Sequence, residues 1–272
     1  MKRILALLLA VMMLLTVFAA CGAKDDAASG SSSGAGAAEI TKFTVGFDAA
    51  FPPYGYRNDN GEYVGFDLDL AAEVCSRNGW ELVKQPIDWD SKDFELNSGT
   101  IDCLWNGFTM NGREDDYTFS EPYINNTQVF VVAADSGIAT HADLAGKIVG
   151  VQTASSALDA LESEDCAELK ASFAEVQTFP EYETAFLNLQ SGAIDAIAMD
   201  VGVADYQLAN RGDGYVKLEQ NLSTEQYAVA FKKGNSELRD KVQATLDAMV
   251  ADGTFDRIAE EWELSDKTCL GK

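Results

Sequence analysis

Short apolar runs alternate with longer segments of helical periodicity along most of this 272-residue chain. The alternation is typical of βα units, in which a buried strand is followed by a helix that covers the sheet. The predicted strands cover residues 43–47, 81–85, 101–105, 147–151, 175–178 and 193–199. The predicted helices cover residues 67–78, a short segment near Phe94, 156–161, 181–190, 236–250 and 254–264. The chain is therefore expected to have an α/β fold with mostly parallel strands.

Two features of the pattern favour two lobes over one sheet. The βα alternation restarts near Lys147, and residues 127–133 before it read as a strand that leaves one unit for the other. A strand at 227–231 would return, so that the last helices rejoin the first lobe. The expected lobes are 39–126 with 226–272 and 127–225, joined by a two-strand hinge. A single large doubly wound domain is the alternative.

The first residues have the organisation of an exported bacterial lipoprotein. A cationic start, Met1-Lys2-Arg3, precedes an apolar run and the small-residue site Ala19-Ala20-Cys21. Residues 1–20 are expected to be a signal peptide, and Cys21 would receive the lipid. A transmembrane anchor is the alternative, but the run is short for a membrane span. Residues 22–38 are rich in Gly, Ala and Ser, so residues 21–38 are predicted to form a lipidated flexible tether. The predicted location is the extracytoplasmic face of the cell membrane.

The charge and the cysteines limit the classes of partner. The chain has 20 Lys and Arg against 44 Asp and Glu, a net charge of −24, which argues against a nucleic-acid partner because phosphate binding needs a basic face. An exported location permits disulfides, but the sequence does not choose among the pairings or exclude free thiols. These cysteines are Cys75, Cys103, Cys166 and Cys269. Their spacing and the lone His141 predict no metal site, and no cofactor is expected.

One motif connects the chain to a known family. Gly65-Phe66-Asp67-Leu68-Asp69-Leu70, followed by Val74-Cys75, resembles the signature of the family 3 bacterial extracellular solute-binding proteins, the polar amino acid receptors of ABC importers. Further matching segments follow in order between residues 42 and 265: 47–54, 119–123, 143–151, 192–196 and 251–255. The resemblance implies a type II periplasmic-binding-protein-like fold. It also implies that a free polar amino acid is bound between two lobes and delivered to permease subunits.

Asp67 and Asp69 have a simpler interpretation than ligand binding. They lie in the first turn of the predicted helix, where acidic side chains complement the helix dipole. Both are expected to support the fold and not to touch the ligand.

An enclosed amino acid needs partners for its two charges, because a buried unpaired charge is costly. For the α-carboxylate the candidate is Arg113, whose guanidinium can bind two carboxylate oxygens. The local sequence alone favours a solvated charged surface at Arg113, whereas the resemblance implies a carboxylate-binding arginine shortly before the Phe119–Tyr123 segment. Ser155 and Ser156 would assist at a helix N-terminus, with simple helix capping as the alternative.

For the α-ammonium the candidate is Asp200, at the carboxyl end of the strand 193–199, where ligands of open α/β sheets gather. An N-cap for a helix that begins near Val201 is the alternative. By the same resemblance, the carbonyl of Gly107 and the hydroxyl of Thr109 complete the cage around the α-groups.

The ligand side chain is expected to meet aromatic walls and one acidic acceptor. The residues are Asp48, Phe51, Tyr54, Trp89 and Phe108. The alternative for the aromatic residues is the hydrophobic core. This set is compatible with glutamine, cystine, histidine, lysine or arginine as ligand.

Two other functions remain open from the sequence. Some relatives of these binding proteins are dehydratases of the cyclohexadienyl type, and others are sensory amino acid receptors. A dehydratase needs a placed acid or base, and His141 is expected to lie near the start of a surface helix, away from the cleft. The protein is therefore predicted not to be an enzyme.

Overall fold

The computed structural model describes residues 40–272. The predicted signal peptide, the lipidation site Cys21 and the tether lie outside these described residues. Within the described part, every helix is too short or too polar to cross a membrane.

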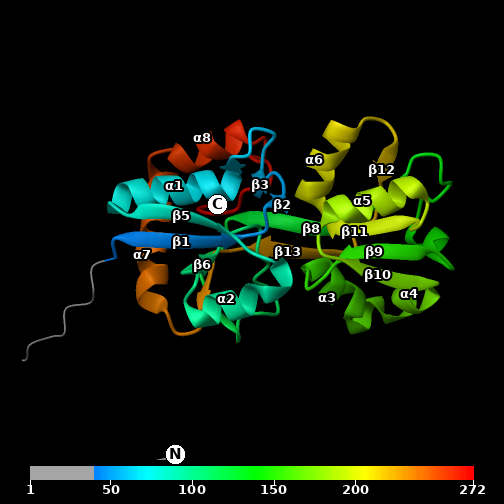
Figure 1. The fold of residues 1–272 in the computed structure, drawn as a ribbon, viewed down its shortest axis with the longest axis horizontal. Coiled ribbons are helices and arrows are strands. Elements are labelled where there is room, and N and C mark those ends of the chain that lie inside the picture. Colours follow the sequence, from blue (N-terminus) through cyan, green and yellow to red (C-terminus); the bar gives the residue numbers. More distant parts are fainter. Residues whose placement is uncertain (1–39) are drawn as a thin grey trace, which may run out of the picture. The chain divides into compact units, whose positions relative to one another are not determined.

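The first lobe is built on a five-stranded sheet with the strand order β5-β1-β6-β14-β7 (Figure 1). β1 is parallel to β5 and β6, whereas β14 is antiparallel to β6 and β7. The strands are β1 (Lys42–Phe47), β5 (Glu81–Pro86), β6 (Cys103–Leu104), β7 (Tyr117–Phe119) and β14 (Ala230–Lys232).

The second lobe is built on a six-stranded sheet with the order β10-β9-β11-β8-β12, and β13 pairs with β8. β9, β10 and β11 are parallel to one another, whereas β8 is antiparallel to its partners. The strands are β8 (Ile124–Ala133), β9 (Ile148–Gln152), β10 (Glu175–Phe179), β11 (Ala196–Asp200), β12 (Tyr215–Lys217) and β13 (Ser223–Tyr227).

β8 and β13 carry the chain between the two sheets. β8 starts directly after the first sheet's β7, and β13 pairs with its first half in the register Tyr227↔Ile124. The chain then returns to the first sheet through β14. The sequence predicts one return strand over 227–231, but the structure contains two, because the chain leaves one sheet at Tyr227 and joins the other at Ala230.

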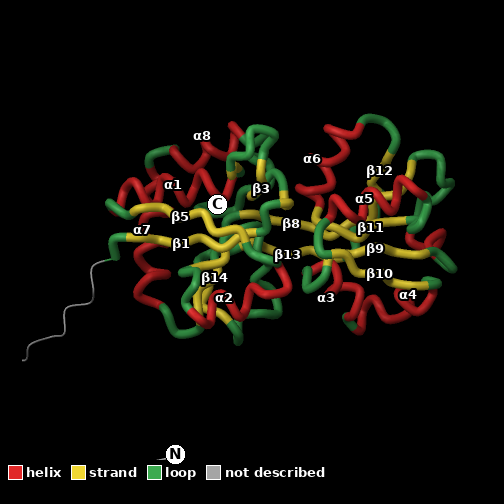
Figure 2. Tube along the Cα trace, viewed as in Figure 1, coloured by secondary structure: helices red, strands yellow, loops and turns green. Residues whose placement is uncertain are grey.

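Helices cover both faces of each sheet (Figures 1 and 2). In the first lobe α1 and α2 lie on opposite faces, and in the second lobe α5 and α6 lie opposite α3 and α4. The α-helices are α1 (Phe66–Asn78), α2 (Lys92–Ser98), α3 (Ser156–Glu162), α4 (Ala167–Ser172), α5 (Tyr182–Ser191), α6 (Val201–Arg211), α7 (Ser236–Ala251) and α8 (Thr254–Glu261). The short 3-10 helices are η1 (Trp89–Ser91), η2 (His141–Leu144) and η3 (Glu164–Cys166).

The alternation of side chains in β11 explains how one strand serves two cores. Ile197 and Met199 belong to the core that also contains the α5 and α6 side chains, whereas Ala196 and Ala198 face the core beneath α3. Because successive strand residues point to opposite faces, an uninterrupted apolar run is typical of a strand that is covered on both sides.

One small sheet has no strong apolar signal in the sequence. A three-stranded sheet of very short strands follows β1: β2 (Ala50–Phe51), β3 (Gly55–Arg57) and β4 (Tyr63–Val64).

The cysteines of the described residues are all free thiols. His141 starts the surface helix η2, as expected, and its ring lies edge-on to Phe130 at 5.0 Å.

Candidate functional site

The carboxyl ends of the parallel strands meet where the two lobes face each other. Residues 106–109 follow β6, residues 152–156 lie between β9 and α3, and Asp200 ends β11. This edge is where ligands of open α/β sheets bind.

A small polar cavity of about 10 Å³ is lined by these loops. Its lining is Phe51, Trp89, Asn106, Gly107, Phe108, Thr109, Arg113, Gln152, Ser155, Ser156 and Asp200. Every site residue predicted from the sequence is present except Asp48, which lies in the adjoining cavity, and Tyr54. Asn106 and Gln152 were not predicted.

Arg113 reaches the polar cavity from the loop between β6 and β7. Its guanidinium lies over the ring of Phe108, with Cζ 4.8 Å from the ring centroid. Nη2 donates to Oδ2 of Asp159 on α3 at 2.6 Å, and Nη1 donates to the carbonyl of Thr109 at 3.4 Å. Because a guanidinium has five N–H donors, Arg113 retains donors for an anion beyond these described partners.

Ser155 is the N-cap of α3, so the capping interpretation is correct for this residue. Its Oγ accepts from the backbone N–H of Leu158 at 3.2 Å and donates to the carbonyl of Gln152 at 2.8 Å. Ala154, just before it, has φ of 54°, a left-handed conformation that non-glycine residues adopt rarely and that occurs often at functional sites.

Asp200 occupies the N-cap position of α6, but its side chain makes no capping hydrogen bond. Instead Oδ1 accepts from Nδ2 of Asn126 at 2.9 Å, from Nε2 of Gln128 at 2.6 Å and from the hydroxyl of Tyr227. Oδ2 accepts from the hydroxyl of Tyr182 at 3.3 Å. Asp200 is therefore the N-cap residue of α6, as the alternative expected, but its carboxylate does not cap the helix and faces the junction of the lobes.

Burial, and next the neighbouring carboxylate of Glu225, raise the pKa of Asp200 to about 7. The donors around it are neutral amides and hydroxyls, which lower that pKa but carry no positive charge. Asp200 thus forms an electronegative site without a counter-cation among its described hydrogen-bond partners.

The loop after β6 presents Gly107 and Thr109 to the polar cavity. Gly107 has φ of 58°, and a Cβ there would lie 2.9 Å from Cε2 of Tyr227 and 3.0 Å from Cε1 of Phe51, so a glycine is required. Oγ1 of Thr109 is buried without a hydrogen-bond partner among the described residues. A buried hydroxyl of this kind is suited to a bound polar group.

Asp67 on α1 holds this loop in place through hydrogen bonds. Its Oδ2 accepts from the N–H of Gly107 at 2.6 Å and from the hydroxyl of Tyr123 at 2.8 Å. Asp67 is fully buried, and burial raises its pKa to about 7. The residue lies outside the lining of the polar cavity, as expected, but it acts through buried hydrogen bonds and not as an exposed charge.

The aromatic residues divide between the cavity and the core. Trp89 packs edge-on against Phe108 at 5.7 Å, and Phe51 packs against Tyr182 at 6.1 Å. Tyr54 is fully buried, and a Cβ at Gly202 would lie 2.3 Å from its hydroxyl oxygen. The structure therefore places Tyr54 in the core between the lobes, because Gly202 at the start of α6 leaves room for its ring.

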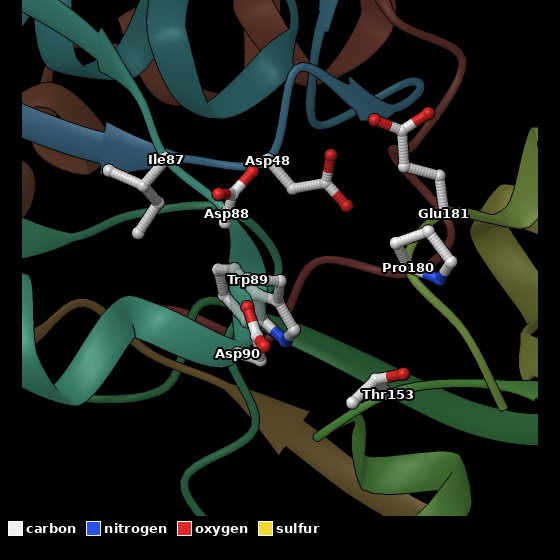
Figure 3. A pocket seen from close by; sticks show the side chains of 8 residues that line it. All are labelled: Asp48, Ile87, Asp88, Trp89, Asp90, Thr153, Pro180 and Glu181. Carbon is white, nitrogen blue, oxygen red and sulfur yellow. The ribbon is translucent and has the colours of Figure 1, made fainter.

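An acidic cavity of about 320 Å³ adjoins the polar cavity and shares Trp89 with it (Figure 3). Its lining is Asp48, Ile87, Asp88, Trp89, Asp90, Thr153, Pro180 and Glu181. Figure 3 shows the first-lobe residues on one side of the space, with Thr153, Pro180 and Glu181 on the other. Carboxylates come from both lobes, and no lysine or arginine is among these described lining residues.

Asp48 lines the acidic cavity and connects the two lobes. Its Oδ1 accepts from the N–H of Ala50 at 2.8 Å, and Oδ2 accepts from Nε2 of Gln152 at 2.7 Å. Burial raises the pKa of Asp48 to about 6. The arrangement provides a hydrogen-bond acceptor beside the aromatic wall of Trp89.

Relatives of this chain bind amino acids. The L-cystine-binding protein TcyJ of Escherichia coli K12 is 30% identical over 227 residues, which are 82% of this chain and 83% of TcyJ. A histidine-bound substrate-binding protein of an ABC uptake transporter from Streptococcus pneumoniae is 35% identical, with a TM-score of 0.78 and coverage of 81% of this chain and 92% of that chain. An ancestral arginine-binding protein bound to arginine is 37% identical, with a TM-score of 0.75 and coverage of 82% and 99%.

These similarities confirm the predicted type II fold, with two α/β lobes. Residues 43–265 match the family of bacterial extracellular solute-binding proteins, family 3. The match covers nearly all the described residues. The chain belongs to family 3 of the bacterial extracellular solute-binding proteins.

Proposed function

We propose that this protein binds a free polar amino acid between its two lobes and delivers it to the permease of an ABC importer. The observation that carries the proposal is that a cation, Arg113, and a buried carboxylate, Asp200, line one cavity from different lobes. An enclosed zwitterion needs both a cationic and an anionic side chain of the protein, because each of its own two charges must meet a partner of opposite sign when water is removed.

Each α-group of the ligand has a set of partners in this proposal. Arg113 binds the α-carboxylate, and Ser155 and Ser156 face it from the second lobe. Asp200 binds the α-ammonium, with the carbonyl of Gly107 and the hydroxyl of Thr109, which has no partner among the described residues, as further acceptors. Binding to both lobes gives the closed state contacts that an open state lacks, and this difference in affinity drives closure.

The acidic cavity supports a cationic ligand side chain, and arginine is the first candidate. Asp48, Asp88, Asp90 and Glu181 line the cavity, while Trp89 offers a ring face to a guanidinium or an ammonium. An acidic side chain would meet like charges there, which costs several kcal/mol. Arginine and histidine in the related solved structures agree with this preference.

The N-terminal residues would hold the protein at the membrane for delivery. Cys21 would carry the lipid, and residues 22–38 would act as the tether. The two lobes of the folded part would divide at residues 126/127 and 225/226. The family is extracellular, and a lipid anchor would keep the receptor close to its permease. We propose binding without turnover, since the reported relatives are binding proteins.

Calorimetric titration of the purified mature protein against the twenty amino acids and cystine tests this function. We expect arginine to bind at least about 100-fold more tightly than glutamate, because of the like-charge cost. Asp88→Asn should reduce that ratio without abolishing binding, since Asp88 faces the acidic cavity and not the polar cavity. Failure of every amino acid to bind would contradict the proposal, and tight glutamate binding would contradict the assigned side-chain preference.

A further inference from the structure

A second buried carboxylate lies beside Asp200. Glu225 on β13 is 8% exposed and Asp200 is 2% exposed. Nδ2 of Asn126 is 2.9 Å from Oδ1 of Asp200 and 2.7 Å from Oε1 of Glu225, while Nε2 of Gln128 is 2.6 Å and 2.8 Å from the same two oxygens. The two carboxylates therefore share their amide donors and lie close together.

The amide groups of Asn126 and Gln128 face more acceptors than they have hydrogens, and Oγ of Ser156 donates to Oε1 of Glu225 at 3.3 Å. The amide nitrogen of Gln128 has two hydrogens, but it faces three acceptors: Asp200, Glu225 and Oγ of Ser156 at 3.0 Å. The amide oxygens of Asn126 and Gln128 have no partner among the described residues, which is consistent with both NH₂ groups being turned toward the carboxylates. One additional proton on the pair would remove one of its two adjacent negative charges.

The charged groups nearby do not neutralise the pair. The titratable groups that face it are the hydroxyls of Tyr54, Tyr182 and Tyr227, whose pKa values burial raises well above the usual range. Arg113 lines the same cavity but forms its ion pair with Asp159, and Nζ of Lys92 donates to the carbonyl of Ala154 at 3.1 Å. Neither carboxylate of the pair has an ion-pair partner among the described residues.

We propose that Asp200 and Glu225 share one proton in the ligand-free site and that the ligand's α-ammonium displaces this proton to solvent. The inference rests on the proposed function. The ammonium keeps its own protons, the O–H bond of the carboxyl group breaks, and the released proton is taken up by the buffer. Glu225 lies outside the cavity lining and contacts Asp200's donors, so it is a positioning residue that acts through Asp200.

The direction of the effect follows from the charge balance. Two buried like charges close together disfavour double ionisation, and the pKa of Asp200 is raised to about 7. Below that pH the empty site holds the proton, so binding must expel it, and the affinity increases with pH. Above that pH the empty site has already lost the proton, and the affinity becomes independent of pH.

Calorimetry in two buffers of different ionisation enthalpy measures the released proton directly. The probe is L-arginine, or L-glutamine if arginine does not bind, titrated into the full mature protein at about pH 6 and about pH 8.5. We expect at least about half a proton released per ligand at the lower pH and almost none at the higher one, with an affinity change of up to about tenfold per pH unit below pH 7.

Variants separate this pair from other acids. Glu225→Gln should remove most of the release at about pH 6 while ligand still binds, because a single carboxylate ionises more readily than a close pair. The matched control Glu168→Gln, an exposed glutamate on α4, should retain the release. The single histidine, His141, lies outside both cavities.

Equal apparent enthalpies in the two buffers for the wild-type protein would overturn the inference, and so would a Glu225→Gln variant that releases as many protons as wild type. In either case a measured affinity for the amino acid would leave the proposed function standing. Absence of binding by any amino acid would instead remove the proposed function itself.

Discussion

Asp69 and Asp200 have the same side chain but different surroundings, and the surroundings decide what each carboxylate does. Asp69 accepts from Nε1 of Trp262 at 2.8 Å at the start of α1, outside both cavities. Asp200 is buried at the lobe junction and accepts only from neutral donors among the described residues. A buried acceptor of that kind attracts a cation, whereas Asp69 already has a structural partner.

Substitutions at three positions test the roles at the residue scale. Arg113→Ala and Asp200→Ala should each weaken amino acid binding by about 100-fold or more, because each leaves a buried ligand charge without its partner. Asp69→Ala should change affinity by less than about threefold, since its hydrogen bond lies outside the site.

Isothermal titration at fixed pH and salt checks this comparison, with circular dichroism to confirm that each variant is folded. Equal losses at all three positions would mean that the site has been located wrongly.

Among the elements, helix α1 depends on a glycine at its start. Gly65 has φ of 145°, and a Cβ there would lie 2.2 Å from the carbonyl oxygen of Tyr54. Because glycine has no Cβ, the chain can pass this close to the backbone of Tyr54 and turn directly from the β2–β4 sheet into α1. α1 in turn supplies Asp67, which fixes the loop of Gly107. The Gly65 turn therefore supports the site without touching it.

Gly65→Ala should lower the free energy of unfolding by about 3 kcal/mol or more, because backbone atoms cannot move away as side chains can. The matched variant is Gly79→Ala at the other end of α1, where φ is 70° but nothing lies within 4 Å of a Cβ. This second change should cost about 1 kcal/mol from backbone conformation alone.

Urea unfolding of both variants under the same conditions gives the two values. A Gly65→Ala variant as stable as Gly79→Ala would show that the close contact carries no energetic weight.

β8 and β13 contribute to the site as a pair. Asn126 and Gln128 are two residues apart on β8, so they face the same side of the sheet, and Glu225 on β13 is in register with Asn126. The two segments that pass between the lobes thus also supply the partners of Asp200. Motion at this crossing would change the environment of the proposed ammonium site.

At the scale of the whole molecule, several buried acids oppose folding at neutral pH. The pKa values of Asp48, Asp67 and Asp200 are raised to about 6, about 7 and about 7, mainly by burial. Between about pH 4 and pH 7 the folded protein therefore binds more protons than the unfolded chain, and stability decreases as the pH rises through this window. The net charge of −24 acts in the same direction, since protonation reduces self-repulsion.

The ligand-free protein should consequently be more stable at about pH 5.5 than at about pH 8, by on the order of a few kcal/mol. Urea unfolding at constant ionic strength measures the difference. Asp67→Asn should reduce the pH dependence by removing one of the titrating groups. A free energy of unfolding that increases from pH 5.5 to pH 8 would contradict the assignment of these buried acids.

The sequence predicts strands best where both faces are buried. The run that forms β11 is apolar without interruption, and the α1 pattern places Leu68, Leu70, Ala71 and Val74 in the core as expected. By contrast, β13 has the sequence Ser-Thr-Glu-Gln-Tyr, which lacks an apolar pattern. It is a strand because β8 pairs with it, and a partner distant in the chain has no local signal.

The same distinction applies to the site. Residues such as Arg113 and Asp200 follow from charge requirements and family resemblance, and the structure brings them to one cavity. Gln152, Glu225 and the ion pair from Arg113 to Asp159 depend on which side chains of the second lobe meet the first. These contacts join residues far apart in the chain.

The amino-acid sequence by itself determined the α/β class and the kinds of residue that a zwitterion requires, because buried-strand periodicity and charge type are local properties. The type II fold followed from the family resemblance of the sequence motifs. Only the tertiary structure decided that Tyr54 belongs to the core, that Asp200 has Glu225 as its neighbour, and that acids from both lobes line one cavity. Each of these depends on distances between segments that are remote in the chain, and those distances exist only once the two sheets have formed and packed.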